Sequence, residues 1–188
     1  MVSAELLLCE DRTMLPNFVL VGFMGCGKTT VGRRLASLTG HRFVDSDDLI
    51  VKDQGKSISA IFAERGEEGF REIEERVLAD LVGVAGVILS TGGGAILREA
   101  NRASLKKTGI VIWLDAQPDV LFERAIRSGR RPLLQTENPR QTFDTLLETR
   151  RPIYESTADF RFDSTGIEHD EVARKVLEQA MRHNARLM

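Results

Sequence analysis

The chain has 188 residues, of which 42% are hydrophobic and 29% charged, so it is long enough to bury the core of one domain. Its formal net charge of −2 argues against general affinity for nucleic acids or membranes, which usually shows as a strongly basic domain or patch. Two cysteines, Cys9 and Cys26, are too few for a disulfide framework, and we expect a reducing, cytoplasmic environment.

Residues 1–16 are predicted to be an extension before a single domain over residues 17–188. The extension contains one short apolar run, residues 6–9, with acidic residues on both sides. Such a run is too short for a signal peptide or a membrane span.

A glycine-rich turn joins an apolar strand, residues 18–21, to a predicted helix. The residues of this turn that fit the pattern G-x-x-x-x-G-K-[ST] are Gly22, Gly27, Lys28 and Thr29. Val31, Leu35 and Leu38 then follow with the spacing of an apolar helix face. A glycine-rich turn without a ligand is the alternative, but the complete match between these flanking elements favours a phosphate-binding loop.

Such a loop binds phosphate because its glycines let backbone N–H groups approach the oxygens, while the helix directs its positive end at the same anion. We expect Lys28 to reach the β- and γ-phosphates of a nucleotide and the Thr29 hydroxyl to bind Mg²⁺, which prefers oxygen ligands. The loop residues predicted to bind the nucleotide are Gly25, Cys26, Gly27, Lys28, Thr29 and Thr30.

Asp45 and Asp47 follow the second predicted strand, residues 42–45. One interpretation is that they only cap the next helix. In a doubly wound parallel sheet, however, ligands collect beyond the carboxyl ends of the strands, so both carboxylates are expected near the phosphates. One could hold Mg²⁺ through water, and the other could accept a proton from a substrate hydroxyl.

An amphipathic helical region is predicted over about residues 57–81, with an interruption near Gly66 and Gly69. Arg71 and Glu74 are three residues apart in it, a spacing that is typical of a surface ion pair. In the alternative interpretation, Arg71 grips a substrate carboxylate and Glu74 holds Arg71 in orientation.

Three consecutive glycines, Gly92, Gly93 and Gly94, follow the third predicted strand, residues 87–91. They could provide a flexible strand exit, but a backbone without side chains also permits close approach of a ligand. A helix is predicted over about residues 95–105, and a fourth buried strand over residues 109–114.

Pro118 marks the start of a helix that is predicted to reach about Arg127. The polar, arginine-rich stretch around it predicts a lid over about residues 124–140, which would close over the phosphates and exclude water. Arg131 is the lid residue expected to touch the transferred phosphoryl group.

The last third of the chain is predicted to contain a helix over about residues 141–156, which Pro152 should bend or end, and a short strand over residues 160–162. An amphipathic helix closes the chain and is expected to fray from about residue 184. The histidines form no metal or triad pattern, and no chemistry is assigned to them.

Taken together, these motifs resemble the shikimate kinase family over about residues 17–180. Besides the phosphate loop, the matching segments are Asp45-Ser46-Asp47, Phe70-Arg71-Glu72-Ile73-Glu74, Gly92-Gly93-Gly94, Arg131-Pro132-Leu133-Leu134 and Arg150-Arg151-Pro152-Ile153-Tyr154. The resemblance implies a three-layer α/β/α P-loop kinase fold with a five-stranded parallel sheet of order 2-3-1-4-5. It also implies transfer of the ATP γ-phosphoryl group to the 3-hydroxyl of shikimate, in the route to chorismate and aromatic amino acids.

The resemblance implies roles for individual residues as well. Asp47 would contact the reacting hydroxyl as the base, and Asp45 would support Mg²⁺ through water. Arg71 and Arg150 would grip the substrate carboxylate beside the backbone of Gly92, Gly93 and Gly94. Arg131 would bridge nucleotide and substrate, and Arg124 would lie near the adenine. With ATP and shikimate as its partners, the protein is expected to be a monomer.

Two places depart from the family pattern. Ile167 and His169 stand where a basic residue and a proline are frequent, on the side expected to contact adenine, and Cys26 stands where serine is frequent. Cys26 is either a tolerated small residue or, as a hypothesis, an exposed and reactive thiolate near the positive end of the helix.

Two other functions compete with this interpretation. A gluconate or nucleoside monophosphate kinase of the same fold would share the phosphate loop, but Asp47, Arg71 and Arg150 favour a carboxylated acceptor. A nucleotide-dependent switch or binding module is disfavoured because the chain has no Asn-Lys-x-Asp guanine signature and little room for an effector domain.

Overall fold

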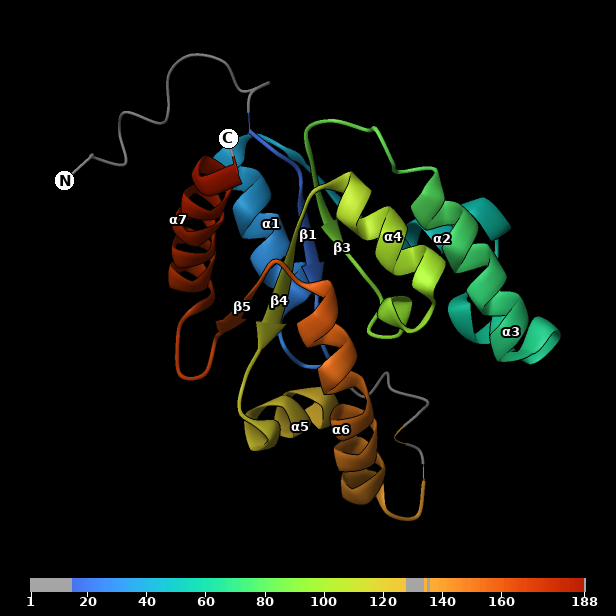
Figure 1. Ribbon diagram of the computed structural model, residues 1–188. Coiled ribbons are helices and arrows are strands. Elements are labelled where there is room, and N and C mark those ends of the chain that lie inside the picture. The colour runs from blue at the N-terminus through green and yellow to red at the C-terminus, as the bar shows by residue number, and fades with distance from the viewer. Residues whose placement is uncertain (1–14, 128–133, 135, 188) are drawn as a thin grey trace.

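The structure, a computed structural model, describes residues 15–127, 134 and 136–187, which contain a five-stranded parallel sheet between two layers of helices (Figure 1). Its strands are β1 (Phe18–Val21), β2 (Arg42–Asp45), β3 (Val87–Ser90), β4 (Ile110–Asp115) and β5 (Phe160–Asp163). The order β2-β3-β1-β4-β5 is the predicted one, so the α/β fold class and its strand order are confirmed.

Helices alternate with the strands along the chain. They are α1 (Lys28–Thr39), α2 (Ser46–Gln54), α3 (Ile58–Ala79), α4 (Glu99–Thr108), α5 (Pro118–Arg127), α6 (Pro139–Thr157) and α7 (His169–Leu187), with a short 3₁₀ turn, η2 (Ala95–Leu97). None of the helices in this described part of the chain is long and apolar enough to cross a membrane.

The central strands β1, β3 and β4 are buried along their whole length, because helices cover both faces of the sheet. Helices α1 and α7 pack together on one face, whereas α4 and part of α6 lie on the other (Figure 1). All strands point the same way, so their carboxyl ends meet at one edge, next to α5 and α6.

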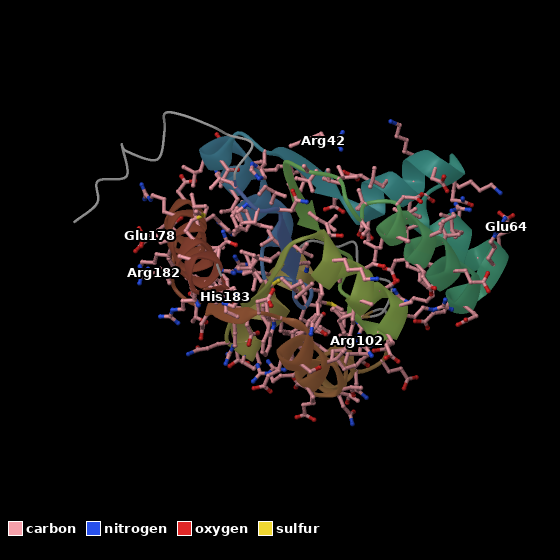
Figure 2. The ribbon with its side chains drawn as sticks, turned by 45° about the horizontal axis from the view of Figure 1, so that its top comes forward. Arg42, Glu64, Arg102, Glu178, Arg182 and His183 are labelled. Carbon is pink, nitrogen blue, oxygen red and sulfur yellow. The ribbon has the colours of Figure 1, made fainter. Side chains whose placement is uncertain are left out.

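The closing helix α7 has the predicted amphipathic character. Glu178 and Arg182 form an ion pair on its exposed side, while the ring of His183 lies 6.0 Å from that of Phe160 in β5 (Figure 2). The helix continues to Leu187, three residues past the position from which fraying is expected.

Several other details differ from the predictions. The helix expected from residue 95 begins as the turn η2, and α4 starts only at Glu99 because Arg98 has an extended backbone. Pro152 does not end α6, which continues to Thr157. The carbonyl that Pro152 leaves without a helical donor belongs to Glu148, and both residues are exposed to water, which can satisfy it. Leu38, expected on the apolar face of α1, is 42% exposed.

Candidate active site

The phosphate loop lies between β1 and α1, at the carboxyl edge of the sheet. Gly22 has a φ of 148°, and a Cβ atom there would collide with the carbonyl oxygen of Leu114 at the end of β4. Gly25 has a φ of 84°, and a Cβ atom there would collide with the carbonyl oxygen of Leu121 in α5. The loop is therefore packed between β4 and α5, and only glycine fits at these two positions.

The start of α1 has the features of an anion site. Its N-cap residue, Gly27, makes no side-chain capping bond, so the first N–H groups of the helix are available to a phosphate. The Lys28 ammonium donates to the carbonyl oxygens of Gly22, at 2.7 Å, and Phe23, at 3.2 Å. These two bonds hold its charge against the loop.

Cys26 is turned inward. Its side chain is only 1% exposed, and its Sγ lies 3.5 Å from Lys28 Nζ, beneath Gly22. The hypothesis of an exposed, reactive thiolate is therefore wrong, because the loop is packed between β4 and α5 with this side chain pointing into the protein.

Asp45 caps α2 and also contacts the start of α1. As N-cap of α2, its Oδ1 accepts the Asp47 N–H at 3.1 Å. Its Oδ2 accepts the Thr29 hydroxyl at 3.2 Å. The two residues expected to support Mg²⁺ are thus already in contact, from different elements.

The carboxylates of Asp47 and Glu74 flank Gly92. A Cβ atom on Gly92 would lie 2.8 Å from Asp47 Oδ1 and 3.4 Å from Glu74 Oε1, so any side chain there would crowd both acids. The Gly92 N–H donates to the Ser46 hydroxyl at 3.1 Å. The first glycine of the triplet is thereby held against the start of α2.

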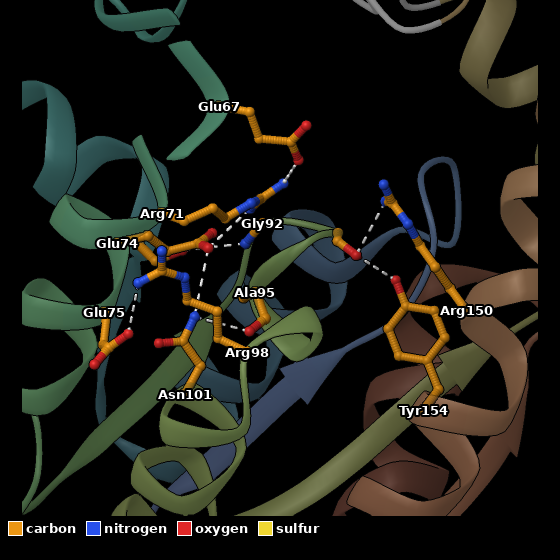
Figure 3. A network of polar contacts seen from close by, with 12 residues as sticks. Glu67, Arg71, Glu74, Glu75, Gly92, Ala95, Arg98, Asn101, Arg150 and Tyr154 are labelled. Carbon is orange, nitrogen blue, oxygen red and sulfur yellow. Dashed lines mark hydrogen bonds and ion pairs between the residues drawn. The ribbon is translucent and has the colours of Figure 1, made fainter. Parts of the chain in front are cut away.

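Arg71 and Glu74 form a buried ion pair rather than a surface one. Arg71 is 9% exposed, Glu74 is 1% exposed, and Arg71 Nη1 donates to Glu74 Oε2 at 2.8 Å (Figure 3). Burial raises the pKa of Glu74, although the charge of Arg71 and its hydrogen bond oppose the rise. The surface-pair interpretation is wrong, and Glu74 is placed to orient the guanidinium.

The other two glycines of the triplet contact the arginines. A Cβ atom on Gly94 would lie 2.4 Å from the Arg71 guanidinium, so a side chain there would displace this group. The Gly93 carbonyl accepts from Arg150 Nη1 at 3.4 Å and from the Tyr154 hydroxyl at 2.6 Å (Figure 3). Two arginines from α3 and α6 thus approach the same short segment of backbone.

The chain resembles known proteins over most of its length. A family model described as shikimate kinase matches residues 24–181. The chain belongs to the shikimate kinase family. The shikimate kinase of Actinobacillus pleuropneumoniae is 46% identical over 162 residues, which cover 86% of this chain and 94% of that protein. That of Thermodesulfovibrio yellowstonii is 44% identical over 168 residues, covering 89% and 96%.

Solved structures agree with this membership. Shikimate kinase from Acinetobacter baumannii, in complex with shikimate, aligns with a TM-score of 0.86 and 42% identity over 90% of this chain and 95% of that one. The enzyme from Aquifex aeolicus aligns with a TM-score of 0.77 and 35% identity, covering 90% and 98%. The predicted family and the predicted enzyme class, a kinase acting on shikimate, are therefore confirmed.

Three residues beside the candidate site were given no role in it by the motifs. Ser46 and Tyr154 hold the glycine triplet, but a serine at a helix start usually only caps the helix, and a tyrosine on an apolar face usually only packs in the core. His169 was assigned no chemistry, yet its Nε2 would be 3.3 Å from a Cβ atom on Gly27, at the start of α1. The signal that could have pointed to His169 is its place in the family pattern, where a proline is frequent.

Two arginines predicted for the site remain, Arg124 and Arg131. Arg124 lies on α5, the helix that packs against Gly25, which is consistent with a place near the nucleotide. Arg131 and most of the lid core, residues 128–133 and 135, lie outside the described residues.

Proposed function

We propose that this protein transfers the γ-phosphoryl group of ATP to the 3-hydroxyl of shikimate, giving shikimate 3-phosphate and ADP in the route to chorismate. The observation that supports the proposal is that the phosphate loop meets the segment contacted by Arg71 and Arg150 at the glycine triplet. A Cβ atom on Gly93 would lie 3.7 Å from Gly22 O and 3.8 Å from Met24 N, so the phosphate loop directly adjoins the segment held by the arginines.

The acceptor side suits a small hydroxylated carboxylate. Arg71 and Arg150 present planar guanidinium groups that match a carboxylate, and Asp47 offers a carboxylate that can accept the proton of a hydroxyl. Glu74 keeps the guanidinium of Arg71 in place. The relative from Acinetobacter baumannii was solved in complex with shikimate, which supports the same acceptor here.

The nucleotide side suits ATP with Mg²⁺. The hydroxyl of Thr29 and the carboxylate of Asp45 supply oxygen ligands of the kind Mg²⁺ prefers, and this ion keeps several waters, so few protein ligands are needed. When bound, it neutralises charge on the phosphates. Lys28 would bind the β- and γ-phosphates, and Asp45 would act through water.

Little covalent chemistry is required of the protein, since positioning and charge stabilisation account for most phosphoryl-transfer catalysis. Asp47 would orient the substrate hydroxyl toward the γ-phosphorus and accept its proton. Lys28 and the first N–H groups of α1 would stabilise the negative charge of the phosphoryl group during transfer. The roles of Arg131, Arg124 and the lid stay predictions, as do the monomeric state and the cytoplasmic location.

The direct test is a coupled assay of ADP formation with shikimate, quinate, gluconate and nucleoside monophosphates as separate acceptors. We expect rapid ADP formation with shikimate and only background rates with the others. Turnover of gluconate or a nucleoside monophosphate in preference to shikimate would overturn the proposal.

A further inference from the structure

Tyr154 makes a short hydrogen bond at the centre of the site. Its hydroxyl donates to the Gly93 carbonyl at 2.6 Å, and its side chain is 1% exposed (Figure 3). The ring is stacked on Trp113 of β4, with the centroids 5.8 Å apart. A strand and a helix thus fix the position of this hydroxyl, and it is not free to turn elsewhere.

The same carbonyl has a second donor, which is an arginine expected to bind substrate. Arg150 Nη1 reaches Gly93 O at 3.4 Å, near the limit for a hydrogen bond, and its guanidinium lies 5.7 Å from the ring centre of Phe23. Gly93 is half-buried, and a carbonyl that is partly shielded from water needs at least one good donor. Since Tyr154 is a neutral donor at a much shorter distance, the guanidinium is not required for this task.

We propose that Tyr154 is a positioning residue: it satisfies the Gly93 carbonyl, so that the Arg150 guanidinium stays available for the carboxylate of the acceptor. This inference rests on the proposed role of Arg150 in binding that carboxylate. The hydroxyl also fixes the triplet from one side, while the Ser46 hydroxyl holds Gly92 from the other. Without Tyr154, the carbonyl draws the guanidinium toward itself, in competition with the substrate.

The Tyr154 hydroxyl keeps the proton that it donates to the Gly93 carbonyl. Burial raises the pKa of Tyr154, against the opposing effect of Arg150. The phenol therefore stays protonated, and a hydrogen-bond donor, at neutral pH.

The test is Tyr154→Phe, which keeps the ring and its stacking and removes only the oxygen. We expect the KM for shikimate to rise about tenfold, in keeping with the loss of one buried hydrogen bond, while the KM for ATP changes less than about twofold. The matched control is Thr157→Val, one turn further along α6. Its buried hydroxyl donates to Ile153 O within the same helix, so its loss should leave both KM values unchanged.

Two further measurements separate this role from a general structural one. In an Arg150→Met background, adding Tyr154→Phe should no longer change the KM for shikimate, because the two residues act as a unit. An analogue with a hydroxymethyl group in place of the carboxylate should bind wild type and Tyr154→Phe with equal affinity.

Specific outcomes would overturn the inference. It fails if Tyr154→Phe leaves the KM for shikimate unchanged, if Thr157→Val reproduces the effect, or if the effect persists without Arg150. These results are distinct from failure of the proposed function, in which the wild-type protein itself does not phosphorylate shikimate.

Discussion

Asp47 and Glu74 are two carboxylates on either side of Gly92, and their surroundings differ. Glu74 is enclosed and paired with Arg71, whereas Asp47 is partly exposed in the first turn of α2, where an acceptor can reach it. Glu74 is therefore suited to hold Arg71 in place, and Asp47 is suited to exchange a proton with a ligand.

The Asp47→Asn substitution tests the second of these roles. We expect turnover to fall by about 10²- to 10⁴-fold, the range typical of losing a general base, while ATP still binds because the phosphate loop is unaltered. Steady-state kinetics and equilibrium binding of nucleotide measure the two effects. Near-normal turnover would remove Asp47 from the chemistry.

Glu74 makes the stability of the protein depend on pH. Its folded pKa is raised above the ordinary value of 4.5, so the folded state holds the proton more tightly than the unfolded state. The resulting stabilisation is fully present below pH 4.5 and is lost as the pH rises through the folded pKa.

The Glu74→Gln substitution removes this titration. We expect the free energy of unfolding of the variant to improve relative to wild type as the pH rises through that window, measured by urea denaturation from about pH 4 to about pH 8. The variant should also bind shikimate more weakly, since its side chain offers Arg71 one acceptor oxygen where Glu74 has two. Stability curves that stay parallel across this range would contradict the expectation.

At the scale of elements, helix α3 is broken in the middle. Gly66 has φ 67° and ψ −173°, a combination that is essentially restricted to glycine. The part before the break packs Ile61 against Ile50 of α2, and the part after it carries Arg71 and Glu74. Because of the break, the first part of α3 packs against α2 and the second part contributes Arg71 and Glu74 to the candidate site.

Gly66→Ala should therefore lower the free energy of unfolding by about 1–3 kcal/mol. Nothing lies within 4 Å of the added Cβ atom, so the cost is in the backbone alone. Urea denaturation measures it, and the KM for shikimate shows whether the second part of α3 has moved. Unchanged stability would mean that the chain straightens at no cost.

Much of this arrangement could be predicted from local patterns. The apolar run before Gly22 and the Gly-Lys-Thr that follows specify a strand, a loop and a helix start together, and the structure has all three. The break in α3 was predicted at Gly66 and Gly69 alike, but only Gly66 is non-helical. Either glycine can adopt that conformation, and packing against α2 decides which one does.

Burial was harder to predict than secondary structure. Arg71 and Glu74 have the same spacing as any exposed helical pair, and contacts with the glycine triplet and with Asn101 of α4 enclose them. The inward turn of Cys26 likewise depends on the tertiary structure, since β4 and α5 press the loop from both sides. Contacts between distant segments are not encoded in any short stretch.

At the scale of the whole molecule, the parts of the site come from separate elements held by one core. Thr29 and Asp45 contact each other directly, so their arrangement does not depend on a bound ion. We expect removal of Mg²⁺ with EDTA to abolish turnover but to leave the Tm of the ligand-free protein unchanged.

Calorimetry and the coupled assay, with excess Mg²⁺ added back as control, check both parts of this expectation. A lower Tm in EDTA would show instead that a metal supports the fold. Turnover that survives chelation would exclude the role proposed for Thr29 and Asp45.

The central position of β1 has a consequence for how the protein is made. Phe18 pairs with Ile88 on one side and Ile110 on the other, so β1 leaves the ribosome long before either neighbour exists. During that interval its apolar residues have no sheet to join and are open to association with other nascent chains. Because Gly22 rests on Leu114, a growing chain gains its phosphate loop only after β4 has emerged, and nucleotide binding would report that β1 and β4 have paired during translation.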